Sequence, residues 1–499
     1  MAEQILSDLQ HFYPELVLTA TLLAAIIADL IFRRSPVIVS AVAMVGVFIA
    51  GTCVLAQQGV NVSIFSNMIA VDPFAYLFKL IIIISAILVV IFSLASVELN
   101  SAGRRLGEYY TLLVALTLGM ILMAGASNLL MMYLALELSS ITSYILSGYT
   151  KEAPDSSEAS LKYVIYGALS SGLMLYGISI IYGMTGSLDI YAINQVLMAG
   201  NYSTVALLFA GALTMAGFGY KISAVPFHFW TPDVYEGAPI TITAFLSVAS
   251  KAGGFAMMIR FFKVAFIDSS VVTLPAGVWA SIQGFEWYNM IAAISVLTMT
   301  LGNLVAIWQK NLKRLLAYSS IAHAGYMMMG LVVMSNEGLA AVMIYFVVYL
   351  FMNLGAFYIV MLVANKTGSE DIEDYKGLGA RAPFLSVSLA IFLISLTGLP
   401  PTAGFIGKLY LFAALLNHGW VWLAVVGALN SVISLYYYVR IFRNLFLRSS
   451  EHEETGPLAF GRIQTATILV LLVPTLLLGL YFTPLIQLAQ ASVKIFGTP

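Results

Sequence analysis

The sequence predicts an all-α polytopic membrane protein with about fourteen transmembrane helices. Three observations lead to this fold class. Of the 499 residues, 61% are hydrophobic and only 9% are charged, which is far from the composition of a soluble domain. Apolar runs of about 20 residues, the length that crosses roughly 30 Å of hydrocarbon, recur along the whole chain. Basic residues gather in alternate connections between these runs, as they do in cytoplasmic loops.

The predicted spans follow one another through short connections. The chain starts with several acidic residues and no early Lys or Arg, so it has no basic n-region of a cleaved signal peptide, and the first span is expected to be retained. The expected spans cover residues 14–32, 37–56, 75–97, 109–125, 128–149, 161–183, 203–230, 239–262, 287–308, 313–334, 338–364, 384–416, 421–443 and 464–486.

The distribution of basic residues predicts the orientation, because cytoplasmic loops accumulate Lys and Arg. If the spans alternate, one side holds only Arg260, Lys263 and Lys494, and both termini lie on that non-cytoplasmic side. The cytoplasmic side then holds sixteen basic residues: Arg33, Arg34, Arg104, Arg105, Lys151, Lys162, Lys310, Lys313, Arg314, Lys366, Lys376, Arg381, Arg440, Arg443, Arg448 and Arg462.

Four lysines remain, and they lie inside predicted spans: Lys79, Lys221, Lys251 and Lys408. A charge near the bilayer centre costs at least about 2.5 to 3.5 kcal/mol, so such a residue is expected to be functional or paired. Lys79 lies one turn inside its span and is expected to snorkel to the headgroups. Lys251 lies about twelve residues into its span among serines and glycines that allow a helix or water to approach. A structural ion pair is the alternative for Lys251.

The spans that carry Lys221 and Lys408 are too long for one simple crossing, and both contain proline. Pro226 follows Lys221, and Gly398, Pro400 and Pro401 precede Lys408. Proline removes a backbone donor and glycine lowers the cost of unwinding, so both helices are expected to be interrupted. Paired interrupted helices mark the ion site in transporters built from inverted repeats. The alternative is an ordinary proline kink with a lysine tethered by a carbonyl.

The two interrupted spans are the seventh and the twelfth, which predicts two five-helix repeats, spans 4–8 and 9–13. An odd number of helices inverts the second repeat relative to the first. Four segments are therefore expected: an N-terminal three-helix segment (1–108), the first repeat (109–262), the second repeat (263–445) and a C-terminal segment with span fourteen (446–499).

Glu137 is the only acidic residue expected well inside the hydrocarbon. Lys221 is the natural partner within the same repeat, because a nearby opposite charge favours both ionised forms while desolvation favours both neutral forms. These opposing effects make the proton affinity of Lys221 switchable by the distance between the two residues. The alternative is a permanently closed salt bridge.

Two histidines and one aspartate complete the set of candidate site residues. His323 lies about ten residues into the tenth span, between Lys251 and Lys408 in the expected order, where an imidazole can relay protons. A packing histidine is the alternative. His228 and Asp233 lie near the cytoplasmic end of the seventh span as candidate proton uptake residues; His228 fits an interfacial aromatic belt equally well.

The residue types that are missing exclude several classes of function. The single cysteine, Cys53, can form neither an iron–sulfur cluster nor an internal disulfide. The sequence has no Walker A loop, dinucleotide fingerprint, haem or metal motif, or basic tract for nucleic acid. We therefore expect a chain that binds no cofactor and moves an ion within the lipid bilayer.

Three motifs resemble one family, the antiporter-like membrane subunits of respiratory complex I. They are the stretch from Lys221 to Pro239, the stretch from Lys313 to His323, and Gly398-Leu-Pro-Pro-Thr-Ala-Gly-Phe-Ile-Gly-Lys408. The resemblance covers essentially the whole chain and is closest to the subunit N branch of NADH-quinone oxidoreductase, the bacterial counterpart of mitochondrial subunit 2.

The resemblance implies a proton-translocating subunit in the inner membrane of a bacterium. It implies Glu137 and Lys221 as a coupling pair, Lys251 and His323 as the central relay, and Lys408 as the terminal proton carrier. The expected partners are neighbouring antiporter-like subunits and small membrane subunits. FMN, iron–sulfur clusters, NADH and a quinone would belong to other subunits. Two alternatives remain open: a subunit of a standalone cation/proton antiporter and a non-pumping structural subunit of a related redox complex.

Overall fold

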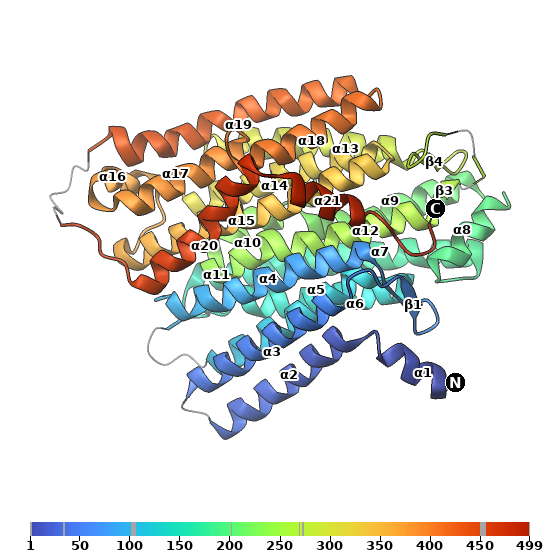
Figure 1. Cartoon of the computed structure of the whole chain (residues 1–499), viewed down its shortest axis with the longest axis horizontal. Helices are drawn as coiled ribbons and strands as arrows, with labels where there is room; N and C mark the ends of the chain where they lie inside the picture. Colours follow the sequence, from blue (N-terminus) through green and yellow to red (C-terminus); the bar gives the residue numbers. More distant parts are fainter. Residues whose placement is uncertain are drawn as a thin grey trace.

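The computed structural model describes residues 2–32, 35–100, 106–200, 202–268, 270–271, 274–449 and 456–498. These residues form a bundle of long, nearly parallel helices (Figure 1). Arg33, Arg34, Arg104 and Arg105, which belong to the sixteen residues expected on the cytoplasmic side, lie outside the described residues.

Within the described ranges, thirteen helical segments are long and apolar enough to cross a membrane. One of them, Ile240–Ala265, is made of α11 (Ile240–Phe245), a π-helical turn η1 (Leu246–Ser250) and α12 (Lys251–Ala265). The others are α2 (Tyr13–Ile31), α3 (Pro36–Ala56), α4 (Pro73–Ala95), α5 (Leu106–Gly125), α6 (Leu129–Ser147), α7 (Pro154–Thr185), α9 (Thr204–Ile222), α13 (Trp287–Ala306), α14 (Leu312–Val332), α15 (Asn336–Thr367), α19 (Val421–Leu447) and α20 (Arg462–Leu480).

The predicted twelfth span consists of two shorter apolar helices, α17 (Pro383–Thr397) and α18 (Ala403–Asn417). Each is too short to cross roughly 30 Å alone. Together with the thirteen longer segments, this pair accounts for every stretch that the sequence predicts as a span. The all-α polytopic fold class is thus confirmed.

The remaining helical elements are short. They are α1 (Ala2–Leu9), α8 (Ile190–Met198), α10 (Trp230–Gly237), η2 (Ile372–Tyr375), α16 (Leu378–Arg381) and α21 (Thr483–Ser492). Two small antiparallel sheets pair β1 (Val62–Ile64) with β2 (Ile69–Val71) and β3 (Ile267–Asp268) with β4 (Ala280–Ser281). Both sheets and both chain ends lie at the same end of the bundle (Figure 1).

The centre of the bundle is formed by the segment from α11 to α12 together with α14 and α15, which are almost entirely buried. Helices that are apolar all round suit such a position. Glycine allows α14 to approach α13 closely. A side chain at Gly325 would not fit, because its Cβ would lie only 2.6 Å from the backbone nitrogen of Met299. Outer helices such as α2 and α20 instead expose one apolar face. The polar residues of the central helices are therefore far from lipid.

The prediction that Lys79 snorkels to the headgroups is wrong. Its side chain is completely buried, and its ammonium lies 2.6 Å from a carboxylate oxygen of Glu15, which is also buried. Gln57 contacts the same ammonium at 3.4 Å. The packing of α2 and α3 against α4 closes over this position, which a prediction from one span alone does not consider.

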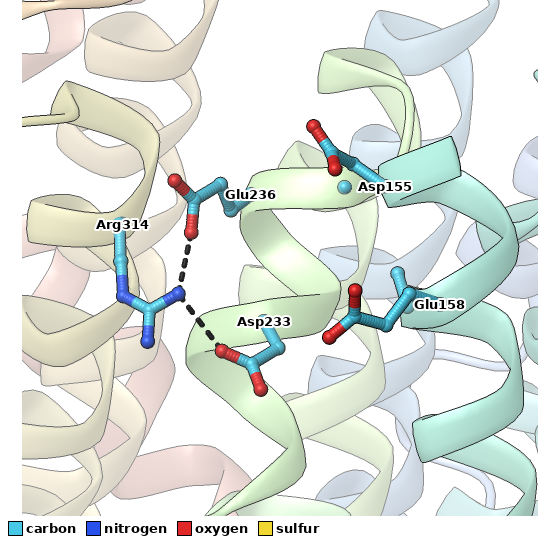
Figure 2. A pocket seen from close by; sticks show the side chains of 7 residues that line it. Asp155, Glu158, Asp233, Glu236 and Arg314 are labelled. Atoms are coloured by element: carbon cyan, nitrogen blue, oxygen red, sulfur yellow. Dashed lines mark hydrogen bonds and ion pairs between the residues drawn. The ribbon is translucent and has the colours of Figure 1, made fainter. Parts of the chain in front are cut away.

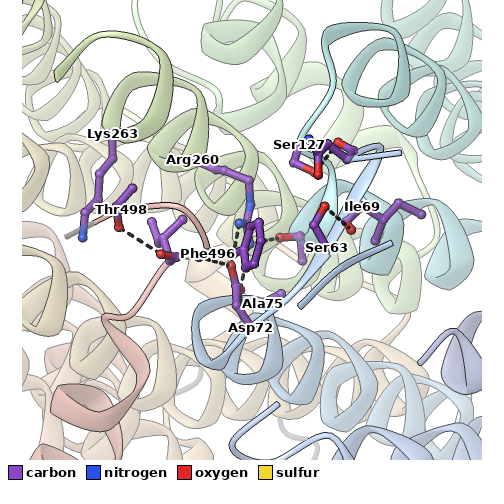
Figure 3. Close-up of polar contacts among 12 residues, drawn as sticks. Ser63, Ile69, Asp72, Ala75, Ser127, Arg260, Lys263, Phe496 and Thr498 are labelled. Carbon is purple, nitrogen blue, oxygen red and sulfur yellow. Dashed lines mark hydrogen bonds and ion pairs between the residues drawn. The ribbon is translucent and has the colours of Figure 1, made fainter. Parts of the chain in front are cut away.

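Arg260 and Lys263, which the sequence predicts on the non-cytoplasmic side, are both buried within α12. Arg260 forms a two-pronged ion pair with Asp72, with N–O distances of 2.6 and 2.9 Å (Figure 3). The same carboxylate caps α4 and accepts a hydrogen bond from the backbone of Phe496 at 2.9 Å. Lys263 contacts Asn336 and faces the ring of Trp279. The C-terminal residues thus close over this end of α12.

Candidate functional site

The first interruption follows Lys221 directly. Helix α9 ends at Ile222, Ser223 adopts a left-handed conformation with φ of 64°, and α10 begins only at Trp230. The predicted interruption is confirmed. Lys221 is buried in the last turn of α9, and its ammonium has one hydrogen-bond partner, the hydroxyl of Ser140 at 3.4 Å.

The second interruption precedes Lys408 and is confirmed as well. Helix α17 ends at Thr397 and is followed by Gly398, whose φ of 88° favours glycine. A Cβ on Gly398 would lie 2.6 Å from Cδ of Lys408. The lysine reaches back across the break, where its ammonium donates to the carbonyl of Thr397 at 2.8 Å. That carbonyl belongs to the negative end of a helix, which favours a cation. Lys408 also donates to Ser431 at 3.0 Å. The alternative predicted a proline kink with a lysine tethered by a carbonyl. The carbonyl contact is present, but the span is divided into two helices and is not a kinked single helix.

Glu137 lies on α6, one turn before Ser140. Its side chain is only half-buried, and its buried oxygen Oε1 has no hydrogen-bond partner. No oxygen of Glu137 lies within 4 Å of the ammonium of Lys221, so the pair is open in this structure rather than a closed salt bridge. Ser140, which contacts Lys221, is on the same helix as the carboxylate.

Lys251 directly follows the π-helical turn η1, a deviation that often occurs at functional sites. Its ammonium donates to both the carbonyl and the hydroxyl oxygen of Ser320, each at 2.7 Å. The hydroxyl of Tyr349 donates to the same serine at 3.0 Å. Lys251 is buried, and no carboxylate of the described residues lies within 4 Å of its ammonium, so the alternative of a structural ion pair is wrong.

His323 connects the surroundings of the two remaining lysines. It lies on α14 one turn after Ser320, which contacts Lys251, and one turn before Tyr326, whose ring faces the ammonium of Lys408. Its Nδ1 shares a hydrogen bond of 2.7 Å with the hydroxyl of Tyr345. The structure thus places His323 between Lys251 and Lys408.

Asp233 lines an acidic cavity of about 170 Å³ at the ends of α7, α10 and α14. Arg314 bridges Asp233 and Glu236 at 2.8 and 2.5 Å (Figure 2). Lys162 contacts Asp233 at 2.5 Å. Asp155 and Glu158 line the cavity from α7 (Figure 2). His228 does not line the cavity. It is buried between α9 and α10 beside Phe229, with no partner for Nδ1.

The structure adds site residues that the sequence interpretation missed. Each is a hydroxyl-bearing side chain in contact with a predicted residue: Ser140, Ser320, Ser431, Tyr326, Tyr345 and Tyr349. A signal was available for the two tyrosines of α15, because Tyr345 and Tyr349 are four residues apart and therefore share a helix face. Over the described ranges, no group of three or more His, Cys, Asp or Glu is placed to hold a metal ion.

Comparisons with known proteins agree with this arrangement. Residues 126–434 match the family described as "NADH:quinone oxidoreductase/Mrp antiporter, TM". The sequence is 50% identical to "NADH-quinone oxidoreductase subunit N 2" of Chloroherpeton thalassium, over 97% of this chain and 94% of that protein.

Two solved structures have similar folds. A chain of respiratory complex I from Thermus thermophilus is 30% identical with a TM-score of 0.77, covering 96% of this chain and 99% of that one. A chain of the Mrp complex from Dietzia sp. is 21% identical with a TM-score of 0.84 and 97% coverage of both chains. The second likeness concerns the fold alone.

Proposed function

Because the chain belongs to the NADH:quinone oxidoreductase/Mrp antiporter transmembrane family, we propose that its buried lysines carry protons along the plane of the membrane. The chain is a multi-pass membrane subunit of an NADH:quinone oxidoreductase, and it pumps protons with the other membrane-arm subunits as partners. We assign NADH, FMN, the iron–sulfur clusters and the quinone to other subunits, and place this chain in the bacterial inner membrane with both termini non-cytoplasmic.

One observation carries the proposal for the site: three buried lysines in the middle of the bundle have no carboxylate within 4 Å in the part of the chain that the structure describes. Lys221, Lys251 and Lys408 are instead held by hydroxyl groups and carbonyls. A buried lysine without a counter-ion binds its proton less tightly, because desolvation disfavours the charged form, and it can therefore release that proton. Ionisable residues of this kind inside a membrane mark proton relays.

The acidic cavity is the proposed uptake site. Its carboxylates concentrate protons at the cytoplasmic end of the bundle, and Asp233 is linked through Lys162 to α7. Tyr163, the next residue of α7, accepts a hydrogen bond through its carbonyl from the hydroxyl of Tyr220 at 3.4 Å. That hydroxyl also contacts Tyr144, one turn after Ser140 on α6. These hydroxyl groups lead toward Lys221.

The open pair of Glu137 and Lys221 is the proposed switch. When a conformational change brings the carboxylate close, it stabilises protonated Lys221; when the pair separates, Lys221 releases its proton. The half-buried position of Glu137 suits this role, because a neighbouring subunit can approach it from outside the chain. Coupling to redox chemistry elsewhere then needs only an electrostatic change at this face.

From Lys221 the proton moves to Lys251, then through His323 to Lys408. Each step moves one charge through a poorly solvated interior. The free-energy difference between successive sites must therefore be modest if the relay is to work repeatedly. Moving one charge across 100 mV costs about 2.3 kcal/mol. A change in proton affinity of one to two pH units, at about 1.36 kcal/mol each, is of that size.

Replacing Lys221 by alanine in the assembled complex tests this function. We expect near-complete loss of proton pumping by inverted membrane vesicles and a parallel fall in coupled quinone reduction. Lys376→Ala, which removes a pair with Glu373 outside the membrane, should pump normally. Full pumping by Lys221→Ala complex of normal subunit content would refute the role of this lysine.

The shared fold with the Mrp complex favours one second candidate, a cation/proton antiporter subunit. That function predicts sodium–proton exchange by vesicles in the absence of NADH and quinone. Purification of the chain with its native neighbours, followed by assay of NADH oxidation and of sodium flux, separates the two functions.

We further propose that residues 109–262 and 263–445 are two inverted repeats, flanked by segments 1–108 and 446–499. The two interrupted helices support this division, because each carries one buried lysine beside its break.

A further inference from the structure

Lys408 is a buried cation whose surroundings contain no negative charge. Its side chain is 4% exposed, and among the described residues no carboxylate oxygen lies within 4 Å of its ammonium. The carbonyl of Thr397 and the hydroxyl of Ser431 supply two hydrogen bonds. The third contact is the ring of Tyr326, whose centroid lies 4.6 Å from the ammonium. The negative face of an aromatic ring attracts a cation at such a distance, most strongly where water is excluded.

The ring of Tyr326 is fixed by a buried cluster of polar side chains. Its hydroxyl accepts a hydrogen bond from Asn303 Nδ2 at 2.9 Å. Asn303 Oδ1 accepts from the hydroxyl of Tyr437 at 2.9 Å, and its Nδ2 also contacts Asn430 at 3.2 Å. All four residues are at most 3% exposed. The ring therefore cannot turn away from Lys408 without leaving buried polar groups unpaired, which is costly.

Tyr326 also lies next to the relay. His323 is one turn earlier on α14, and the two rings meet edge to face with centroids 5.8 Å apart. The other titratable groups that the helices around α18 present at this level are Tyr345 of α15 and Tyr437 and Tyr438 of α19. Tyrosines are ordinarily uncharged near neutral pH. The ring of Tyr326 is thus the group that takes the place of a counter-ion for Lys408.

We propose that Tyr326 is a further residue of the proton relay, whose ring stabilises the protonated form of Lys408. Asn303 and Tyr437 are positioning residues that hold this ring beside the ammonium. The inference rests on the proposed role of Lys408 as terminal proton carrier. A ring suits a carrier because it favours the charged form moderately: cation–π energies correspond to about a 2- to 30-fold change in proton binding. The charge of a carboxylate in contact would hold the proton more firmly.

The test weakens the ring face while keeping its shape. Tyr326 is replaced in the assembled complex by phenylalanine and then by difluoro- and trifluorophenylalanine, and proton pumping is measured against pH. Fluorine withdraws electrons from the ring, so each fluorinated variant should have a lower proton affinity at Lys408 than the phenylalanine variant. We expect the alkaline limb of the pumping profile to move to lower pH stepwise, by about 0.4 to 1.5 pH units in total.

A matched series at Tyr358 is the control. This ring is also in the bundle but stacks on Phe92, 4.3 Å away, with no cation in contact, so its fluorination should leave the limb in place. If Lys408→Ala stops pumping but the alkaline limb does not move along the Tyr326 series, the inference about Tyr326 is overturned, while the proposed function of Lys408 stands. Full pumping by Lys408→Ala complex would instead overturn the proposed function of that lysine.

Asn303→Leu provides an independent variant that keeps the tyrosine at position 326 unchanged. It removes the hydrogen bond between Asn303 and the hydroxyl of Tyr326. Tyr326→Phe removes the same hydrogen bond by deleting the hydroxyl. The two variants should shift the limb in the same direction, and the double variant should shift it no further than the larger single effect. Additive shifts, or an unchanged limb in Asn303→Leu, would contradict the positioning role.

Discussion

Two sets of buried cations in this chain differ in their partners. Lys79, Arg260 and Lys313 each contact a carboxylate, from Glu15, Asp72 and Glu370 respectively, at 2.6 to 2.8 Å. The three lysines of the proposed relay, Lys221, Lys251 and Lys408, contact hydroxyl groups and carbonyls instead.

The difference teaches how one bundle keeps some charges fixed and others exchangeable. A buried cation beside a carboxylate is locked in its ionised form, because either partner left alone is a buried uncompensated charge. A buried lysine held by neutral dipoles has no counter-ion to offset the desolvation of its charged form, so it releases its proton more readily. Burial alone therefore does not identify a proton carrier. The contact partner separates the two sets, and Lys263, which is buried beside Asn336 and Trp279 near the end of α12, is a further buried lysine with neutral contacts that lies outside the proposed relay.

Removing Arg260 should give the largest effect and should act on stability. Arg260→Met leaves Asp72 buried and uncompensated, so we expect a loss of about 3 to 5 kcal/mol, seen as a lower melting temperature of the complex and less assembled subunit. The double variant with Asp72→Asn should recover most of this loss. Normal stability with lost pumping would instead place Arg260 in the relay.

Neutralising Glu137 should have the opposite profile. Glu137→Gln removes no ion pair, since the carboxylate is not within 4 Å of Lys221, so stability should hardly change. Pumping should fall by about tenfold or more, because the switch loses its charge. Vesicle pumping and thermal melting of the same preparation check both. A large loss of stability in Glu137→Gln would contradict the distinction between the ion-paired cations and the lysines of the proposed relay.

The smallest effect is expected at Ser320. Ser320→Ala removes the hydroxyl contact to Lys251 but keeps the carbonyl contact at 2.7 Å, so pumping should fall by only about threefold. Ser431→Ala offers a matched variant at Lys408, where the carbonyl of Thr397 also remains. A complete loss of pumping in either variant would show that the hydroxyl itself carries the proton.

Features encoded by local composition could be predicted from the sequence. The spans follow from apolar length, and the interruptions near Lys221 and Lys408 follow from nearby proline and glycine, whose effect on a helix is local. The candidate residues followed from the rarity of charge in apolar segments. The place of His323 between two lysines also agreed with the structure, since its neighbours are one turn away on the same helix.

Features that depend on tertiary packing were not predictable in this way. Asp72 and Arg260 are 188 residues apart, and nothing in either segment points to the other. Lys79 seemed close to a helix end, but α2 covers it. The hydroxyl groups around Lys251 and Lys408 come from other helices, and serine and tyrosine are too common for their presence alone to signal contact.

The π-helical turn Leu246–Ser250 has a consequence for how chains of this kind tolerate insertion and deletion. Such a turn holds one residue more than an α-helical turn of the same length. Deleting a single residue there would convert the turn into an ordinary α-helical turn, so Lys251 would keep its orientation relative to α11 while the segment stayed apolar and long enough to span the bilayer. The ammonium would still point to Ser320. This turn is therefore a place where one codon can be lost without altering either the hydropathy profile or the direction of this lysine.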